Sequence, residues 1–150
     1  MNKVKYVHYG MNCFIPKVFQ PIQNIPFRNK PNGELWASRK DARFGWKEWS
    51  EENEFHLEGL NRSFEFILSD NANVMEIHSV SDLEKLPQQD ISGIPSLFVS
   101  KPIFPDFEKI LKSGVDAIEL FLSDDMALYY KLYGWDCDCI LIMNPDIVEA

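Results

Sequence analysis

Two aspartates close to the end of the chain are spaced so that they could stabilise a positive charge. Asp136 and Asp138 lie two residues apart in the turn GWDCDC, directly before the apolar segment CILIM. If this segment is extended, both carboxylates point to the same side at the entrance of a strand. Paired acids in that place could serve a developing cation, and they could equally be solvated turn residues.

A third acid, Glu119, lies within the apolar segment GVDAIEL. In a strand, Ala117 and Glu119 face one side of the sheet while Ile118 and Leu120 face the other. Burial would raise the pKa of this carboxyl unless a cation or hydrogen-bond donor pairs with it, so a carboxylate on a core strand is a candidate acid, base or charge stabiliser. The alternative is a solvent-facing residue on a half-exposed sheet.

His8 and Tyr9 end an alternating segment, VKYVHY, which Gly10 closes. A histidine on an otherwise apolar strand is more often a core or pocket-wall residue than a catalyst. The other histidines, His56 and His78, have no spacing typical of a metal site or a catalytic triad. The sequence also lacks G-x-S-x-G, P-loop and G-x-G-x-x-G motifs, so the enzyme classes that depend on them lose support.

Three tryptophans, Trp36, Trp46 and Trp49, lie close together in the sequence and are interleaved with Ser38 and with arginine and lysine residues. A flat ligand could stack on these rings while the polar groups orient it. Hydrophobic anchoring of a loop is the competing interpretation.

The chain has three cysteines, Cys13, Cys137 and Cys139. An odd and small number does not suit a secreted disulfide framework, so we expect a reducing, cytoplasmic location. Cys137 and Cys139 form a C-x-C pair, but a structural zinc site usually requires four converging ligands, and we expect the two thiols to point apart. We therefore predict no metal site.

The composition fits one folded domain covering residues 1–150, since 45% of the residues are hydrophobic and the length suits a single core. With 15 basic and 23 acidic residues the net charge is −8, which is the wrong sign for a groove that neutralises phosphates and argues against nucleic-acid binding. No run of about 18 apolar residues occurs, and no apolar segment follows the first lysines, so we expect neither a membrane span nor export.

The hydrophobic pattern predicts short strands and helices between longer loops. Prolines at positions 16, 21, 26 and 31 favour an extended, wrapping loop over residues 12–33. The turn formers SDNAN predict that the strands on either side of them form an antiparallel pair. This mixture favours a mostly antiparallel α+β fold. Strands are predicted over residues 4–9, 34–38, 64–68, 74–77, 96–100, 115–120 and 139–143, and helices from Ser50, Ser81, Asp106 and Met126.

Taken in chain order, the segments VHYG, LWAS, GVDAIEL and CILIMNPDIV resemble those of the ADP-ribosyltransferase-like superfamily. Members often close with a helix, a GYDAI-type strand and a final strand that runs into a D-P-x-x-I tail, and residues 107–148 follow that order. The resemblance implies a split, curved core of two mostly antiparallel sheets with short helices, and a cleft that holds NAD as the substrate.

The resemblance also implies roles for individual residues. His8 would hydrogen-bond the NAD ribose, Trp36 or Tyr9 would stack on the nicotinamide, and Ser38 would support the pocket. We add Trp46, from the tryptophan cluster, to this binding set. The implied reaction cleaves the bond between nicotinamide and ribose and transfers ADP-ribose to an acceptor, for which a protein is one class.

The chain departs from the superfamily pattern at the expected catalytic acid. Many members place a glutamate at or near the start of the last strand, where this chain has Cys139 flanked by Asp138. Asp138, then Asp136, then Glu119 are the candidate substitutes for a carboxylate that stabilises the ribose cation. The departure keeps two functions open, an NAD-dependent ADP-ribosyltransferase-like enzyme and a noncatalytic ligand-binding or protein-interaction module. The negative charge argues against a third, a relative that removes a phosphate from RNA.

Overall fold

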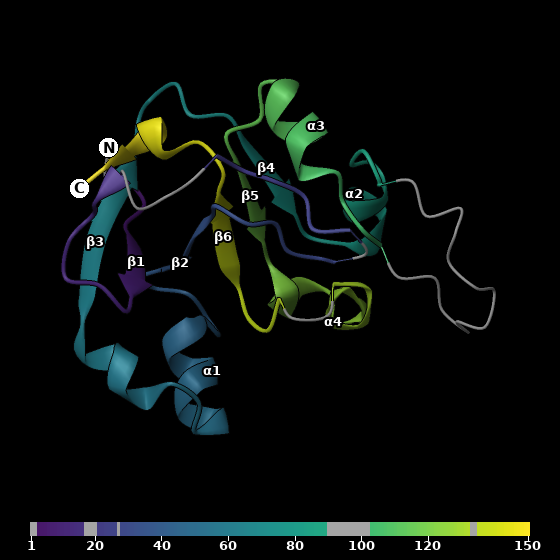
Figure 1. The fold of residues 1–150 in the computed structure, drawn as a ribbon. Coiled ribbons are helices and arrows are strands. Elements are labelled where there is room, and N and C mark those ends of the chain that lie inside the picture. Colours follow the sequence, from purple (N-terminus) through teal and green to yellow (C-terminus); the bar gives the residue numbers. More distant parts are fainter. Residues whose placement is uncertain (1–2, 17–20, 27, 90–102, 133–134) are drawn as a thin grey trace.

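The structure, a computed structural model, describes residues 3–16, 21–26, 28–89, 103–132 and 135–150 (Figure 1). Short strands and helices alternate along the chain without a regular repeat. The strands are β1 (Tyr6–Tyr9), β2 (Leu35–Arg39), β3 (Ser63–Leu68), β4 (Val74–Ile77), β5 (Ala117–Leu120), β6 (Cys139–Ile142) and β7 (Val148–Glu149). The helices are α1 (Trp46–Asn53), α2 (Val80–Glu84), α3 (Phe107–Lys112) and α4 (Ala127–Lys131), with short 3₁₀ helices that include η2 (Leu57–Asn61) and η3 (Leu122–Asp124).

The described strands form one curled sheet in the order β4-β5-β6-β2-β1-β3-β7. Every pair is antiparallel except β4 with β5, so the predicted mostly antiparallel α+β fold with short helices is confirmed. The predicted division into two sheets is not present as a break in pairing. Instead the sheet is staggered at β2, whose residues Leu35 to Ala37 pair with β6 while Ser38 and Arg39 pair with β1.

The predicted antiparallel pairing of residues 64–68 with 74–77 is wrong. β3 pairs with β1 and β7, and β4 pairs in parallel with β5. Parallel neighbours need a long crossover, and here the connection from Ile77 to Ala117 carries α2 and α3. The strand predicted at residues 96–100 lies outside the described residues.

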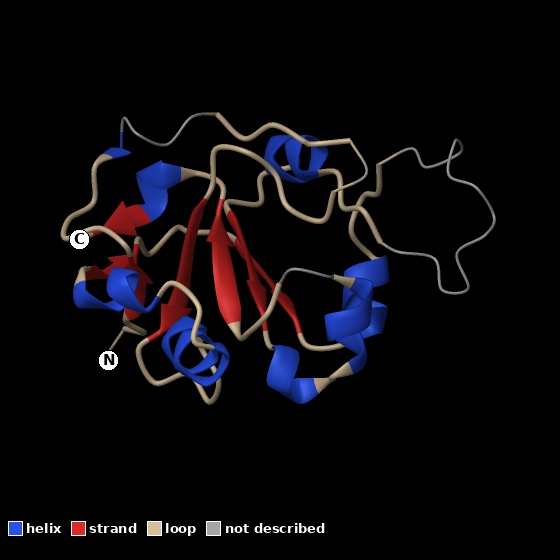
Figure 2. Ribbon diagram, turned by 60° about the horizontal axis from the view of Figure 1, so that its bottom comes forward, coloured by secondary structure: helices blue, strands red, loops and turns tan. Residues whose placement is uncertain are grey.

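Both faces of the central strands are covered. Ile118, Leu120 and Leu141 belong to one hydrophobic cluster, together with residues of α2, α3 and α4. Ala117 and Ile140 belong to a second cluster on the opposite face. All residues of β5 and β6 are therefore buried, which explains their nearly continuous apolar sequences. Figure 1 shows α2, α3 and α4 gathered around β4, β5 and β6, whereas α1 lies below β1, and Figure 2 shows the same division from a second direction.

Two of the predicted helix starts are wrong. α1 begins after Gly45 rather than after Ser50, and Ser50 is buried inside the helix. α2 begins after Ser79, whose side chain accepts a hydrogen bond from the backbone N–H of Asp82, so Ser81 lies within the helix. The start of α3 is confirmed, because the Asp106 carboxylate accepts from the backbone N–H of Lys109. In α2 and α3 the side chain of the residue before the helix thus satisfies a free backbone N–H of the first turn.

The predicted loop over residues 12–33 does wrap around the domain, as its described part shows. Ile22 belongs to the core, and the Asn24 side chain accepts a hydrogen bond of 2.7 Å from the first backbone N–H of α3, that of Phe107. The backbone carbonyl of Asn29 accepts a hydrogen bond of 2.7 Å from Trp135 Nε1. The loop is thus tied to both α3 and the segment before β6.

Glu119 of β5 lies at the centre of a buried polar group that joins three strands. Its side chain is 5% exposed, and its two carboxylate oxygens accept hydrogen bonds of 2.7 and 3.1 Å from the Arg39 guanidinium of β2. The Tyr6 hydroxyl of β1 donates to the same carboxylate at 2.9 Å. Burial and the Glu119 charge raise the pKa of Tyr6, and the hydrogen bond to Glu119 raises the pKa of Arg39. Glu119 thus has the cation and donor that a buried carboxylate requires.

Replacing Glu119 with alanine is expected to destabilise the fold strongly. Removal of one partner of a buried pair leaves the other charge uncompensated, and because Arg39 is partly exposed we expect a loss of about 2 to 4 kcal/mol. Tyr6→Phe removes one hydrogen bond and should cost about 1 kcal/mol. Denaturant unfolding of both variants measures the free energies, and equal losses for the two would contradict a central role for the carboxylate.

Candidate functional site

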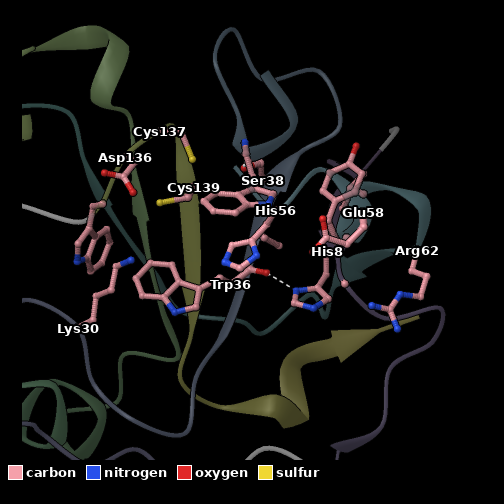
Figure 3. A pocket seen from close by; sticks show the side chains of 17 residues that line it. His8, Lys30, Trp36, Ser38, His56, Glu58, Arg62, Asp136, Cys137 and Cys139 are labelled. Atoms are coloured by element: carbon pink, nitrogen blue, oxygen red, sulfur yellow. Dashed lines mark hydrogen bonds between the residues drawn. The ribbon is translucent and has the colours of Figure 1, made fainter. Parts of the chain in front are cut away.

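One pocket of about 410 Å³ opens between the ends of β1, β2 and β6 and the η2 segment (Figure 3). Its volume falls within the ~300 to 1,000 Å³ that is usual for small-molecule sites. The pocket is lined by Val7, His8, Tyr9, Gly10, Lys30, Trp36, Ala37, Ser38, Trp46, His56, Glu58, Gly59, Arg62, Trp135, Asp136, Cys137 and Cys139. All five residues of the binding set predicted from the sequence, which are His8, Tyr9, Trp36, Ser38 and Trp46, are among them.

Two tryptophans and a lysine form one end of the pocket. The rings of Trp36 and Trp135 meet edge to face with their centroids 4.8 Å apart. Hydrogen bonds of their indole N–H groups to Glu34 and Asn29 fix both rings. Lys30 Nζ lies 5.2 Å from the centre of the Trp36 ring, a cation–π distance. This end offers flat apolar surface beside a positive charge.

Ser38 holds the floor of the pocket together rather than projecting a free hydroxyl into it. Its hydroxyl donates to the Asp138 carbonyl at 2.9 Å and accepts from the backbone N–H of Trp46 at 3.0 Å. A methyl group on Gly45 would lie only 3.0 Å from the Ser38 Cβ, so only glycine allows this approach of α1 to β2. Ser38 thereby positions Trp46, which stacks on Trp49 at a centroid distance of 5.1 Å.

His8 presents one ring nitrogen to the pocket and uses the other for structure. Its Nδ1 lies 2.5 Å from the Trp36 carbonyl, and because a carbonyl can only accept, Nδ1 carries the proton. In the neutral ring Nε2 is then an acceptor. Burial lowers the pKa of His8, and the bond to the Trp36 carbonyl only partly opposes this, so the neutral form is favoured. His8 can therefore accept a hydrogen bond from a hydroxyl group of a ligand.

The three predicted acids occupy different environments. Asp136 is half-buried, lines the pocket and has no hydrogen-bond or ion-pair partner among the described side chains. Asp138 does not line the pocket, and its carboxylate accepts from the Ser123 backbone N–H at 2.8 Å and from the Ser123 hydroxyl at 2.7 Å. Glu119 lies outside the pocket as well, in the group with Arg39 and Tyr6. The structure thus brings only Asp136 together with the predicted binding residues.

The expectation that the two C-x-C thiols point apart is wrong. Cys137 and Cys139 both line the pocket, and both belong to the same hydrophobic cluster. A hydrogen bond with Cys137 and burial raise the pKa of the Cys139 thiol, which keeps it protonated. Within the described ranges, no three histidine, cysteine, aspartate or glutamate side chains are grouped so that they could hold a metal ion.

Sequence reasoning missed several residues of the pocket wall. Lys30 comes from the wrapping loop and Trp135 precedes the paired aspartates, whereas a further group belongs to or flanks η2: His56, Glu58, Gly59 and Arg62. His56 and Arg62 flank η2 with left-handed and extended backbone, so the period of a 3₁₀ helix does not predict their direction. No local pattern predicts that this helix faces the end of β1.

Comparison of the chain with protein-family models, curated proteins and solved structures found no match. The helices that the structure describes are all too short or too polar to span a bilayer.

The pKa values of the half-buried His8 and the exposed His78 are expected to be shifted in opposite directions. Burial lowers the pKa of His8 below its ordinary value of about 6.5, whereas the hydrogen bond to Asp124 raises that of His78. His8 therefore contributes stability above about pH 6.5 that is lost as the pH falls, and His78 contributes stability below about pH 6.5 that is lost as the pH rises through its raised pKa. An NMR titration, with His78→Gln for assignment, measures both values, and a His8 pKa above 6.5 would disprove the buried neutral ring.

Proposed function

We propose that the pocket binds NAD and that the protein is an NAD-dependent ADP-ribosyltransferase-like enzyme. One observation carries the proposal. The five residues that the sequence resemblance and the tryptophan cluster select for NAD come from three segments, and all of them line the same pocket. Asp136, one of the three acids selected as a catalytic carboxylate, lines it too. This convergence of β1, β2 and the start of α1 on one pocket supports the proposal.

The chemistry of the pocket suits the nicotinamide half of NAD. The nicotinamide ring is flat and would pack against Trp36 and Trp135. The neighbouring ribose carries hydroxyl groups, and His8 Nε2 offers an acceptor for one of them. Cys139 and Ala37 add small apolar or weakly polar surface to the pocket wall.

The proposed reaction breaks the bond between the ribose C1′ and the nicotinamide nitrogen. The electron pair of that bond leaves with the ring nitrogen, which turns the pyridinium into neutral nicotinamide and leaves a cation on the ribose. The carboxylate of Asp136 would stabilise this cation, and in a pocket shielded from water the stabilisation is larger than in bulk solvent. A nucleophile of the acceptor, a protein side chain or water, then bonds to C1′ and loses its proton.

A noncatalytic binding module is the second candidate, and the position of Asp138 favours it. The acid nearest to the superfamily's catalytic position is buried against Ser123 and does not line the pocket. If no carboxylate stabilises the ribose cation, the same pocket would bind NAD and release it unchanged. The two candidates therefore differ in turnover and not in binding.

Incubation with NAD labelled in the nicotinamide ring tests the enzyme function. We expect release of free nicotinamide, and we expect Asp136→Asn to slow it by about 100-fold or more, since loss of one charge-stabilising group commonly costs that much. NAD binding, measured by the shift in unfolding temperature, should remain.

Asp138→Asn and Glu58→Gln are the matched controls for Asp136→Asn. Asp138→Asn should lower stability through its bonds to Ser123 without a comparable loss of turnover. Glu58 is the other carboxylate of the pocket wall, and Glu58→Gln tests whether it replaces Asp136. NAD binding without nicotinamide release by the unmodified protein would favour the noncatalytic module, and absence of binding would refute both candidates.

A further inference from the structure

The end of α1 and the start of η2 carry an apolar patch on the outside of the protein. The patch consists of Phe55 and Leu57, which are 45% and 44% exposed, together with the half-buried Trp46 and Trp49. The Phe55 ring meets the two tryptophan rings edge to face, at centroid distances of 6.3 and 5.4 Å. Apolar side chains that gather on an exposed segment in this way are typical of a protein-interaction surface.

The backbone on both sides of Phe55 holds its ring in this exposed place. Glu54 ends α1 and His56 precedes η2, and each has a left-handed backbone with φ of 50°. Phe55 is therefore the one residue between two sharp changes of chain direction. The backbone N–H of Phe55 donates to the Ser50 carbonyl at 3.0 Å, which ties the connection to α1. A partner that covers Phe55 thus meets a surface that is already in place, which lowers the entropic cost of binding.

The same segment carries a strong excess of negative charge. Residues 46–58 contain a single basic residue, Lys47, and five exposed glutamates, which are Glu48, Glu51, Glu52, Glu54 and Glu58. The Glu48 carboxylate accepts from the backbone N–H of Gly45 at 3.2 Å. Among the described residues, no hydrogen bond or ion pair engages the other four carboxylates. The apolar patch is therefore accompanied by carboxylates whose charge the protein does not neutralise.

This charge selects the class of partner that fits the patch. Nucleic acids and anionic lipid surfaces carry the same sign of charge and would be repelled. In a two-fold dimer, a second copy of the chain would bring the same glutamates against one another. A positively charged protein segment is attracted instead. An apolar centre with a rim of charged groups is also the usual composition of a protein interface.

We propose that the patch docks a basic segment of a partner protein, in which lysines or arginines flank an apolar side chain. The apolar side chain packs on Phe55 and Leu57, and the basic side chains pair with the glutamates. The inference does not depend on what the pocket binds. Trp46 and Glu58 line the pocket as well, so a docked segment would lie beside the pocket. In Figure 1, α1 lies at one end of the molecule, away from α2 and α3, which leaves this end accessible.

Fluorescence anisotropy with the labelled peptide KRLWKRLK tests the inference, because this peptide places apolar side chains between basic ones. We expect saturable binding that weakens as the salt concentration rises. The peptide EDLWEDLE reverses the charge, and KRSGKRSK keeps the charge but lacks the apolar side chains. Each of these two should bind at least about tenfold more weakly, and Phe55→Ser should weaken binding of KRLWKRLK by about tenfold as well.

Two matched controls separate the patch from general effects of surface and charge. Tyr130→Ser removes an exposed aromatic ring from α4 and should leave the binding of KRLWKRLK unchanged. Glu52→Lys in α1 and Glu84→Lys in α2 change the net charge equally, and both positions are exposed. Glu52→Lys should weaken binding more than Glu84→Lys, and this comparison does not alter the packing of Phe55. The unfolding temperature of each variant checks that it is folded.

Several outcomes would overturn the inference. Equal affinities of Phe55→Ser and Tyr130→Ser for KRLWKRLK would do so, as would equal affinities of Glu52→Lys and Glu84→Lys. Absence of KRLWKRLK binding, or equally tight binding of KRSGKRSK, would also contradict a basic segment with an apolar anchor. Analytical ultracentrifugation of the protein alone tests the second copy as the occupant. A dimer that Phe55→Ser dissociates would assign the patch to self-association instead.

Discussion

The buried contact of Glu119 with Arg39 and Tyr6 is the constraint on which the arrangement of the sheet depends. β2 pairs with β6 through its first residues and with β1 through its last, so few backbone bonds hold the two halves of the sheet in register there. The Glu119 carboxylate of β5 accepts hydrogen bonds from Arg39 of β2 and Tyr6 of β1, and β6 lies between β5 and β2 in the sheet. This contact therefore links the two halves of the sheet. A charge buried in this way tolerates little displacement, because a small shift would leave it without partners. The curvature that brings the end of β1 beside β2 is therefore fixed by a polar contact within an apolar core.

The same contact also positions the pocket residues of β2. In β2, Leu35 and Ala37 belong to the second hydrophobic cluster and alternate with Trp36 and Ser38, which line the pocket together with Ala37. Fixing Arg39 fixes that alternation, and with it the tryptophan ring and the serine that ties α1 to the strand before it. The acid in the core and the candidate ligand groups in the pocket are thus connected through one strand of five residues.

Short-range patterns predicted those parts of the fold and site that depend on neighbours in the sequence. Alternation located most of the strands, and the aromatic and polar residues of the first two strands identified His8, Trp36 and Ser38. Side-chain direction at the closing turn could not be predicted, because Asp136 and Asp138 have the same type and similar surroundings in the sequence. Among the described side chains, Ser123, which donates twice to the Asp138 carboxylate, distinguishes them. The parallel pairing of β4 with β5 was missed for a similar reason, since a turn-rich loop indicates a hairpin whether or not another strand competes for the partner.

The position of β6 in the sheet has a consequence for how the protein is made. β6 holds residues 139–142, near the end of the chain, yet it lies between β5 and β2. A ribosome therefore releases β1, β2 and β5 before the strand that joins them, and until then β2 and β5 both expose an unpaired edge. The residues that finish the pocket, Trp135 to Cys139, arrive with that strand. The wall of the pocket should consequently be completed in one late step, after insertion of β6.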